Sequence, residues 1–294
     1  MKISGQLTLH DLPRVCPLLC RQTNPRFGDF QTREVAVGEV RFGTGRPVVI
    51  AGPCAVESHD QTLAVARAVK RAGADMLRGG AYKPRTSPHE FQGTGVEGLC
   101  ILRIAREETG LPIVTEVMDT RLVEQVAEYA DMLQIGSRNM QNYPLLAEVG
   151  RAGKPVLLKR GMAASLAEWL GAAEYIAKQG NLDIVLCERG IKAFAAGEYS
   201  RFMLDLNVVP AVLANTFLPV IVDPSHATGV ASMVEPASRA ALEFGSHGVM
   251  IEVADFGLGR PRCDADQAIS GETLARIVRF ADRYYERSVM EHAA

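Results

Sequence analysis

Eight short apolar segments, rich in β-branched residues, recur at intervals along most of the chain. They occupy residues 47–51, 75–78, 112–116, 132–135, 155–159, 183–187, 219–223 and 248–252. Successive segments begin 20 to 37 residues apart, so each interval has room for one helix. Continuous apolar runs are typical of strands that are buried on both faces of a parallel sheet. Eight strand–helix units in roughly 240 residues predict an α/β fold, a (β/α)8 TIM barrel.

The intervals between these segments contain helical patterns that end at glycine. Three of them run over residues 61–73, 164–180 and 234–245. Glycine just past the last apolar position is the usual left-handed end of a helix. A doubly wound open sheet is the alternative, but it usually carries a glycine-rich dinucleotide fingerprint after its first strand. The stretch AGPCAVES (51–58) is not such a fingerprint, so the pattern favours the barrel.

The beginning of the chain differs from the rest because it lacks a sustained apolar period. We predict that residues 1–35 form a loosely structured N-terminal extension, too short to be a separate domain of ordinary size. A hairpin is predicted in the sequence REVAVGEVRF (33–42), with its turn at Gly43 to Gly45. Residues 36–294 are predicted to form the barrel domain, with this hairpin at its start.

The charge and the apolar content exclude several classes of protein. The formal net charge is −2, so no global basic field would attract nucleic acid or an anionic membrane. No apolar run reaches the ~18 residues that a membrane span needs. The N-terminus lacks the basic-then-apolar pattern of a signal peptide, and six cysteines are too few for a disulfide scaffold. We therefore expect a cytoplasmic protein without a nucleic-acid or membrane partner.

Polar residues follow nearly every predicted strand. The active site of a parallel barrel lies at the carboxyl ends of its strands, because the strand–helix loops converge there. The residues at these positions are Cys54, Glu57, Arg78, Lys83, Glu116, Gln134, Arg138, Lys159, Arg160, Glu188, Arg189, Asp223, His226 and Glu252. We expect them to form one polar rim around a shared cavity.

Positive charge is concentrated on this predicted rim. Its basic residues are Arg78, Lys83, Arg85, Arg138, Lys159, Arg160 and Arg189. So many cations repel one another unless anions bind among them. Guanidinium groups bind carboxylates and phosphates through paired hydrogen bonds, and lysine adds a point charge. The rim therefore predicts small, multiply anionic substrates; the alternative is that each cation pairs with a nearby acid.

A second subset of rim residues has the composition of a metal site. A thiolate, an imidazole and carboxylates suit a divalent Mn, Fe, Co or Zn ion better than Mg or Ca. The residues are Cys54, His226, Glu252 and one more acid from the final loop, for which we select Asp264. An isolated cysteine is more often a small apolar side chain, and we interpret Cys16, Cys20, Cys100 and Cys187 in that way.

Six motifs at the predicted strand ends resemble those of one enzyme family. They are AGPCAVES (51–58), RGGAYKPRTSPHEFQG (78–93), QIGSRNMQN (134–142), LLKRG (157–161), CERGI (187–191) and DPSHATG (223–229). In order and spacing they resemble the type I beta subgroup of 3-deoxy-D-arabino-heptulosonate 7-phosphate (DAHP) synthases. This subgroup is related to the 3-deoxy-D-manno-octulosonate 8-phosphate synthases. The resemblance covers about residues 36–285.

The resemblance implies a transferase that condenses phosphoenolpyruvate with erythrose 4-phosphate and releases inorganic phosphate, the first step of the shikimate pathway. It implies that a divalent metal is held by Cys54, His226, Glu252 and Asp264. It implies phosphoenolpyruvate binding by Arg78, Lys83, Gln134, Arg138, Lys159 and Arg189, and erythrose phosphate binding by Pro84, Arg85, Thr86 and Ser87. The corresponding stretch of the octulosonate enzymes reads Ala-Asn-Arg-Ser, so the four-carbon aldose is favoured.

The resemblance also implies catalytic roles and an assembly. The expected catalytic residues are Lys83, Glu116, Lys159 and His226, with Glu116 orienting or deprotonating the water that adds at C2. Lys159 could instead form a Schiff base, as in metal-free aldolases. Barrels of this family commonly form homo-oligomers, so we expect a tetramer or a dimer. Residues 1–35 are too short for the regulatory domains of many relatives, so we expect no inhibition by aromatic amino acids.

The final loop, residues 252–270, departs from the family pattern. The family usually has His where this chain has Ala254, and Gly where it has Ala265. Asp255 and Asp266 are competitors of Asp264 for the metal. The change is either neutral or the mark of a specialised paralogue with another aldose or pathway. An octulosonate synthase and a catalytically silent anion-binding barrel are the rival interpretations.

Overall fold

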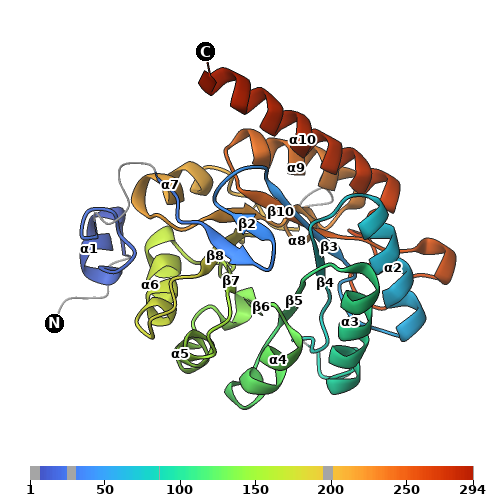
Figure 1. Ribbon diagram of the computed structural model, residues 1–294. Helices are drawn as coiled ribbons and strands as arrows, with labels where there is room; N and C mark the ends of the chain where they lie inside the picture. Colours follow the sequence, from blue (N-terminus) through green and yellow to red (C-terminus); the bar gives the residue numbers. More distant parts are fainter. Residues whose placement is uncertain (1–6, 25–30, 86, 195–200, 294) are drawn as a thin grey trace.

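Eight parallel strands form a closed barrel in the order β10-β3-β4-β5-β6-β7-β8-β9 (Figure 1). The structure is a computed structural model that describes residues 7–24, 31–85, 87–194 and 201–293. The strands are β3 (Val48–Gly52), β4 (Met76–Arg78), β5 (Ile113–Glu116), β6 (Met132–Ile135), β7 (Val156–Lys159), β8 (Ile184–Glu188), β9 (Val220–Val222) and β10 (Gly248–Glu252). The predicted (β/α)8 barrel is therefore confirmed, and each strand lies within a predicted segment or one residue beyond it.

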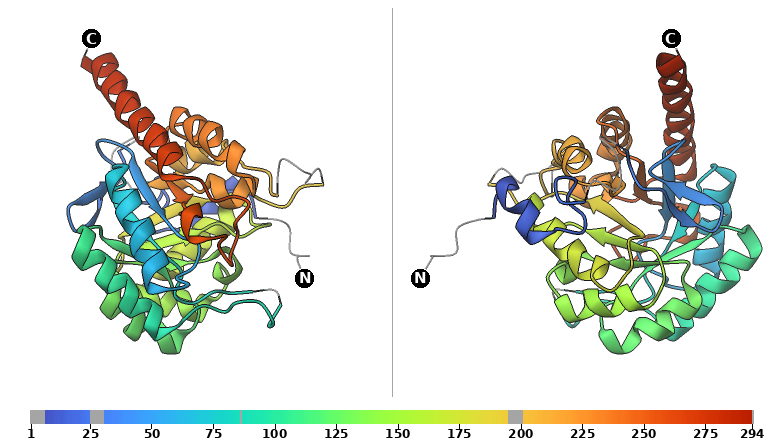
Figure 2. Two further views of the ribbon diagram at one scale, coloured as in Figure 1. Left: turned by 90° about the vertical axis from the view of Figure 1, so that its right-hand side faces the viewer. Right: turned by 60° about the vertical axis from the view of Figure 1, so that its left-hand side comes forward.

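Helices surround the barrel. They are α2 (His59–Arg71), α3 (Val96–Thr109), α4 (Val123–Tyr129), α5 (Tyr143–Arg151), α6 (Leu166–Ala177), α7 (Val208–Asn215), α8 (Pro224–Thr228), α9 (Ala231–Glu243) and α10 (Gly271–Ala293). Shorter helical turns are η1 (Leu9–Asp11), α1 (Leu12–Val15), η2 (Thr120–Leu122), η3 (Ser137–Asn139) and η4 (Phe256–Leu258). The last helix, α10, extends past the outer ring (Figures 1 and 2). In the described part of the chain, no helix combines the length and the apolar character needed to cross a membrane.

Local sequence signals set the ends of these helices. Ser58 begins α2, because its hydroxyl accepts a hydrogen bond from the backbone N–H of Gln61 at 3.3 Å. Ser165 begins α6 with a capping box, in which the Glu168 carboxylate accepts from the Ser165 backbone at 2.8 Å. After α2 the chain turns at Gly73 with φ of 89°, the left-handed conformation that glycine tolerates.

The strands separate two apolar layers, which explains their continuous apolar sequence. One layer fills the inside of the barrel and includes Ile50, Met132 and Leu157. The other lies between the strands and the helices and includes Val49 and Leu158. Because successive strand residues point to opposite faces, every position of these strands is buried.

The N-terminal hairpin closes the amino end of the barrel. It consists of β1 (Val35–Val37) and β2 (Val40–Phe42), and Val37 lies opposite Val40. The turn therefore falls at Gly38, which has φ of 58°, and Glu39. The predicted turn at Gly43 to Gly45 is wrong; those residues connect β2 to β3. A two-residue turn keeps Val35 and Val37 of β1 on the same face as Val40 and Phe42 of β2, and this face joins the barrel interior, with Val40 only partly buried.

The described residues that precede the hairpin are packed against the barrel, contrary to the loose structure expected for the extension. Leu12, Cys16, Leu19 and Cys20 are all buried and join the apolar cluster that also fills the space between strands and helices. The α1 segment lies beside α6, as Figure 1 also shows. Apolar burial thus orders residues 7–24, and the domain boundary at residue 35 stays a prediction.

Side chains at the amino end of the barrel accept hydrogen bonds from strand backbones. The three bonds are Val49 N–H to Asp75 Oδ2 at 2.7 Å, Ile113 N–H to Asp131 Oδ2 at 2.7 Å, and Val220 N–H to His247 Nδ1 at 3.2 Å. Each acceptor immediately precedes the strand that neighbours its donor. This end of the barrel therefore satisfies its buried polar groups with nearby partners.

Candidate active site at the carboxyl end of the barrel

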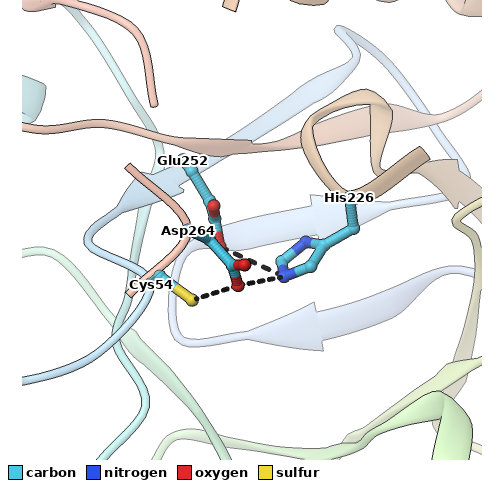
Figure 3. Close-up of side chains that lie close together, drawn as sticks. All are labelled: Cys54, His226, Glu252 and Asp264. Carbon is cyan, nitrogen blue, oxygen red and sulfur yellow. Dashed lines mark hydrogen bonds and ion pairs between the residues drawn. The ribbon is translucent and has the colours of Figure 1, made fainter. Parts of the chain in front are cut away.

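Four of the predicted side chains meet at the carboxyl ends of β3, β9 and β10 (Figure 3). Cys54 follows β3, His226 lies on the short helix α8 after β9, Glu252 ends β10, and Asp264 lies on the loop before α10. Each offers one ligand atom, and these atoms all lie within 4.8 Å of one another. Closure of the barrel makes this possible, because β10 pairs with β3 in parallel register. Chain segments separated by about 200 residues therefore converge.

The imidazole of His226 has a fixed orientation. Asp223, the residue before α8, accepts the His226 backbone N–H at 3.0 Å and lies 2.7 Å from its Nδ1. The other ring nitrogen, Nε2, lies 3.1 Å from Glu252 Oε1. Burial lowers the pKa of His226, although the carboxylates of Asp223 and Glu252 oppose this shift. A neutral imidazole with Nδ1 held by a carboxylate presents Nε2 as a metal ligand.

The carboxylate of Asp223 also holds Lys159. Its Oδ2 lies 2.5 Å from Lys159 Nζ, and both side chains are buried. Burial opposes ionisation of Asp223, but the adjacent charges of His226 and Lys159 outweigh it and hold the pKa of Asp223 well below its usual range. One buried carboxylate thus positions a candidate metal ligand and a candidate substrate-binding lysine together.

Glu252 is fixed by contacts on both carboxylate oxygens. Arg78 Nη1 donates to Oε1 at 2.9 Å, and Gln267 Nε2 donates to Oε2 at 2.5 Å. Burial alone would raise the pKa of Glu252, but the charges of His226 and Arg78 lower it overall. The side chain is therefore an anion that cannot rotate freely within the group.

Asp264 is the acid of the final loop that faces the group. Its Oδ2 lies 3.2 Å from Cys54 Sγ and 4.0 Å from His226 Nε2. Burial opposes its ionisation, but His226 and the hydrogen bond with Cys54 hold the pKa of Asp264 well below its usual range. Of its competitors, Asp255 accepts the Gly257 N–H within η4, and Asp266 pairs with Arg260 in an exposed position.

The donor set fits a divalent transition metal. One sulfur, one imidazole nitrogen and two carboxylate oxygens converge from four separate segments, and Cys54 and Glu252 are buried. This mixture of soft and harder donors suits Mn, Fe, Co or Zn. Without an ion, burial raises the pKa of the Cys54 thiol well above its ordinary value. A bound cation would favour the thiolate, so metal binding would release a proton.

A cavity of about 690 Å³, including its open mouth, adjoins this group. Most of the predicted substrate-binding and catalytic residues line it. They are Arg78, Lys83, Pro84, Arg85, Glu116, Gln134, Arg138, Lys159, Arg189 and His226. Ser87 is not among the lining residues; its hydroxyl accepts the His89 N–H at 3.3 Å. Thr86 lies outside the described residues.

The cations of this cavity differ in how they are held. Lys83 Nζ donates to the Cys54 carbonyl at 3.0 Å, and Arg189 stacks on the Phe202 ring with 4.1 Å between guanidinium carbon and centroid. Burial lowers the pKa of Arg189. Arg138 is exposed and has no side-chain partner among the described residues. These groups present positive charge that the neighbouring acids do not fully neutralise.

Six predicted rim residues do not line the cavity: Cys54, Asp223 and Glu252 belong to the candidate metal group or hold it in place, and the others are Glu57, Arg160 and Glu188. Arg160 turns outward and pairs with Glu188 at 3.0 Å and Asp205 at 2.8 Å. The alternative of pairing with nearby acids is therefore correct for Arg160, and Arg78 and Lys159 also pair with acids, Glu252 and Asp223. Glu57 accepts the backbone N–H of Arg262 at 2.8 Å, so it anchors the final loop.

Glu116 reaches the cavity because a glycine, Gly136, follows the neighbouring strand β6. A Cβ at Gly136 would overlap Oε1 of Glu116. Gln134 Nε2 donates to Glu116 Oε2 at 3.4 Å, which leaves the carboxylate able to accept a further hydrogen bond. Its place on the cavity wall is compatible with the predicted role in orienting water.

Three residues near the group were missed by the sequence analysis. Cys263 Sγ lies 2.8 Å from Cys54 Sγ. Arg201, which lines the cavity, donates a hydrogen bond of 3.3 Å to Asp264 Oδ1. Gln267 is the third, through its bond to Glu252. Only Cys263 had a visible signal, because it immediately precedes Asp264, the acid that we selected as a metal ligand.

Comparison with known protein families decides the relationship of the chain. Residues 25–286 match the model of the DAHP synthetase I family. The chain belongs to this family. The resemblance inferred from the six strand-end motifs is therefore confirmed.

The relatives include enzymes of two substrate types. The chain is 47% identical over 219 residues to a phospho-2-dehydro-3-deoxyheptonate aldolase of Thermotoga maritima, a match that covers 74% of this chain and 64% of that protein. A crystal structure of this aldolase (DAHP synthase) from T. maritima superimposes with a TM-score of 0.86 at 40% identity, covering 92% of this chain and 77% of that one. A 2-dehydro-3-deoxyphosphooctonate aldolase of Syntrophotalea carbinolica is 35% identical over 236 residues, 74% of this chain and 83% of that protein.

Proposed function

We propose that the chain catalyses the metal-dependent condensation of phosphoenolpyruvate with erythrose 4-phosphate, giving DAHP and inorganic phosphate. The observation that carries this proposal is the position of the Cys-His-Glu-Asp group beside a cation-lined cavity, to whose wall it contributes His226 and Asp264. A metal beside a strongly positive cavity suits two phosphorylated substrates that must react with each other. The product would enter the shikimate pathway.

The proposed metal ligands are Cys54, His226, Glu252 and Asp264, and the proposed ion is Mn, Fe, Co or Zn. A divalent ion in this position supplies Lewis acidity toward the aldehyde oxygen. The chain itself holds the donors in place, because Asp223 fixes the ring of His226 and Arg78 fixes the carboxylate of Glu252.

The proposed phosphoenolpyruvate site comprises the buried cations of the cavity together with the exposed Arg138 at its wall. Arg138 makes no ion pair within the described chain, Arg189 makes only long hydrogen bonds to the carbonyls of Gly190 and His226 at 3.4 and 3.3 Å, and Lys83 and Lys159 add point charges. Their role is to hold a multiply charged anion close to a second anion that repels it. Lys159 forms an ion pair with Asp223 at 2.5 Å, which supports a role as a cation rather than as a Schiff-base nucleophile.

The proposed erythrose phosphate site lies at the outer part of the cavity, at Pro84 and Arg85, with Thr86 and Ser87 as further predicted contacts. Arg85 Nε donates to the Phe91 carbonyl at 3.1 Å and the guanidinium also contacts the Cys263 thiol, so the side chain is held at the cavity wall, where a guanidinium can bind a phosphate. We expect Arg85→Ala to raise the KM for the aldose phosphate ~10-fold or more and to change that for phosphoenolpyruvate much less. Steady-state kinetics with each substrate varied would check this; the reverse order would contradict the placement.

Water addition at C2 is the remaining step, and Glu116 is the proposed residue that orients or deprotonates this water. The carboxylate lines the cavity on the strand adjacent to Gln134 and has lone pairs left for a water molecule. Gln134 and Gly136 keep it pointed inward.

A product assay with two aldose phosphates tests the proposed function. Erythrose 4-phosphate and arabinose 5-phosphate are each supplied with phosphoenolpyruvate, across Mn, Fe, Co, Zn and EDTA. We expect turnover with erythrose 4-phosphate that EDTA abolishes. Preference for arabinose 5-phosphate would indicate an octulosonate synthase, to which several relatives correspond. The absence of both turnover and stoichiometric metal would indicate a catalytically silent anion-binding barrel.

We also expect the chain to act in the cytoplasm as a homo-oligomer, a tetramer or a dimer. Exposed apolar side chains on the projecting end of α10, Val289 and Met290, are compatible with contact between subunits. Light scattering after size-exclusion chromatography gives the mass directly; the mass of one chain would contradict the expected assembly.

A further inference from the structure

A second cavity, which we call the side cavity, adjoins the cation-lined cavity at the carboxyl end of the barrel. Its volume is about 740 Å³, including its open mouth. It lies among the loops that follow β6, β7 and β8, which contribute Arg138, Met162 and Lys192 to its lining. Ser137, Arg138 and Met162 line both cavities, so the two share a wall. An anion in one cavity therefore lies next to the other.

The side cavity carries positive charge without an acid to balance it. Arg138 and Lys192 both line it and are exposed, and none of its lining residues within the described chain is an aspartate or a glutamate. Neither cation makes an ion pair with a described residue, whereas Arg160 beside them on the β7 loop pairs with two acids. Like charges at one cavity repel each other unless an anion binds there. The side cavity therefore favours a negatively charged ligand.

Ser137 adds an unused hydrogen-bond donor on the shared wall. Its hydroxyl oxygen is buried and has no hydrogen-bond partner within the described chain. A buried hydroxyl without a partner is unfavourable, so a ligand that accepts its proton is stabilised there. A phosphate oxygen accepts hydrogen bonds from hydroxyl, ammonium and guanidinium groups alike. The three kinds of donor present here therefore match a phosphate.

The walls of the side cavity are held by contacts between the three loops. The Gly161 N–H donates to Met140 Sδ at 3.0 Å, which joins the β7 loop to the β6 loop. The Lys192 N–H donates to the Met162 carbonyl at 2.7 Å, which joins the β8 loop to the β7 loop. A Cβ at Gly161 would lie only 3.2 Å from Met140 Sδ, so the close packing of these loops depends on glycine. The side cavity is thus formed by the fold itself.

We propose that the side cavity is a second phosphate site, which receives the inorganic phosphate released by the reaction before it leaves the protein. Lys192 and Arg138 supply the charge, and the Ser137 hydroxyl supplies a further donor. The source of the phosphate rests on the proposed function, because that condensation releases it. The binding of phosphate in the side cavity does not.

A second site solves the problem of releasing a tightly held dianion. In the first cavity the phosphate faces Lys83, Lys159 and Arg189, and product release of this kind often limits turnover. Arg138 has no partner within the described chain, so its guanidinium can stay with the phosphate as the ion crosses the shared wall. Lys192, which lines only the side cavity, then replaces the cations that the phosphate leaves behind.

The test counts inorganic phosphate bound to the purified full chain, by equilibrium dialysis with radiolabelled orthophosphate. We expect two phosphates per chain alone, and one when saturating phosphoenolpyruvate occupies the first cavity. Lys192→Met keeps the length of the side chain and removes its charge, so it should weaken the remaining binding ~10-fold or more. Lys192→Arg should restore it. Lys178→Met, which removes an exposed lysine at the end of α6, is the matched control and should bind phosphate as the wild type does.

Three results would overturn the proposal. The first is a single phosphate that phosphoenolpyruvate displaces completely, and the second is equal binding by Lys192→Met and the wild type. The third is tighter binding of glycerol 3-phosphate than of orthophosphate in the presence of phosphoenolpyruvate, which would assign the side cavity to a phosphorylated substrate. Failure of the proposed function looks different: two phosphates bind, Lys192→Met loses one of them, and no DAHP forms.

Discussion

The two ends of this barrel hold their buried polar groups in opposite ways. At the amino end, Asp75 and Asp131 accept strand N–H groups and also pair with Arg46 at 2.8 Å and Arg106 at 3.1 Å. At the carboxyl end, polar groups of both signs line an open cavity, and exposed Arg138 has no partner among the described side chains. The polar groups named at the amino end are paired with one another, whereas the carboxyl end retains polar groups that can bind a ligand.

This difference predicts which substitutions should lower the free energy of unfolding and which should lower the activity. A satisfied buried acceptor stabilises the fold, because its removal leaves a backbone N–H without a partner. A charged group that faces a cavity contributes little to folding but can bind an anion strongly. We therefore expect substitutions at the carboxyl end to change kinetics and those at the amino end to change unfolding.

Cys54→Ala should give the largest effect, at the carboxyl end. Loss of the only soft ligand in the proposed metal set should lower metal affinity ~100-fold or more, and turnover at limiting metal ~1000-fold, equivalent to about 4 kcal/mol. Chelator-buffered titrations give the metal dissociation constant. An unchanged constant would remove Cys54 from the ligand set.

Arg138→Ala should lower kcat/KM for phosphoenolpyruvate ~100-fold, about 2.7 kcal/mol, because a cation of the proposed anion site is lost. Since Arg138 is exposed and makes no ion pair within the described chain, the free energy of unfolding should change by less than ~0.5 kcal/mol. Kinetics and chemical denaturation of one preparation measure both quantities. A clear loss of stability with normal kinetics would break the proposed division of roles.

Asp131→Ala should show the opposite behaviour at the amino end. The Ile113 N–H and the Arg106 guanidinium both lose a partner, so the free energy of unfolding should fall by about 2 kcal/mol while kcat stays unchanged. Urea denaturation measures the loss. Asp131→Asn is the matched control, since it keeps an acceptor oxygen and should lose less. A lower kcat at full metal saturation would contradict the separation of the two ends.

His247 predicts a smaller, pH-dependent effect at the same end. Burial lowers the pKa of His247 to about 4, whereas an unfolded histidine titrates near ~6.5. Between these values the unfolded chain binds a proton that the folded chain excludes, so stability is greatest above pH ~6.5 and falls as the pH drops toward 4. The loss should be on the order of 1–2 kcal/mol.

The control for this prediction is His247→Asn, which removes the titrating group. We expect the difference between the denaturation midpoints of the two proteins to be smaller at pH 4 than at pH 7. His226, whose pKa burial also lowers, contributes with the same sign in both proteins and cancels in the difference. Parallel pH profiles would show that His247 does not titrate as expected.

Much of the fold could be predicted because burial on both faces leaves a direct mark on the sequence. The apolar runs at β6 and β10 match their strands residue for residue. The hairpin turn could not be placed, because Gly38 competes with Gly43 and Gly45, and all three have positive φ. The packing of residues 12–20 was missed because their apolar positions do not lie within one regular helix.

The candidate site was predictable where strand order forces convergence. Cys54 and Glu252 follow from the pairing of the first and last barrel strands. Arg160 could not be separated from its neighbour Lys159, because the residue after a strand can turn inward or outward. Arg201 and Cys263 come from loops whose path no strand dictates, so their positions required the structure.

The single oxygen that Lys159 and His226 share on Asp223 has a thermodynamic consequence. A phosphorylated ligand that draws the ammonium group toward itself loosens one of the two contacts on that oxygen. More of the carboxylate's charge then falls on the imidazole, whose opposite nitrogen becomes a better electron donor. Ion and anion should consequently enhance each other's affinity by the same factor, whichever of them arrives first.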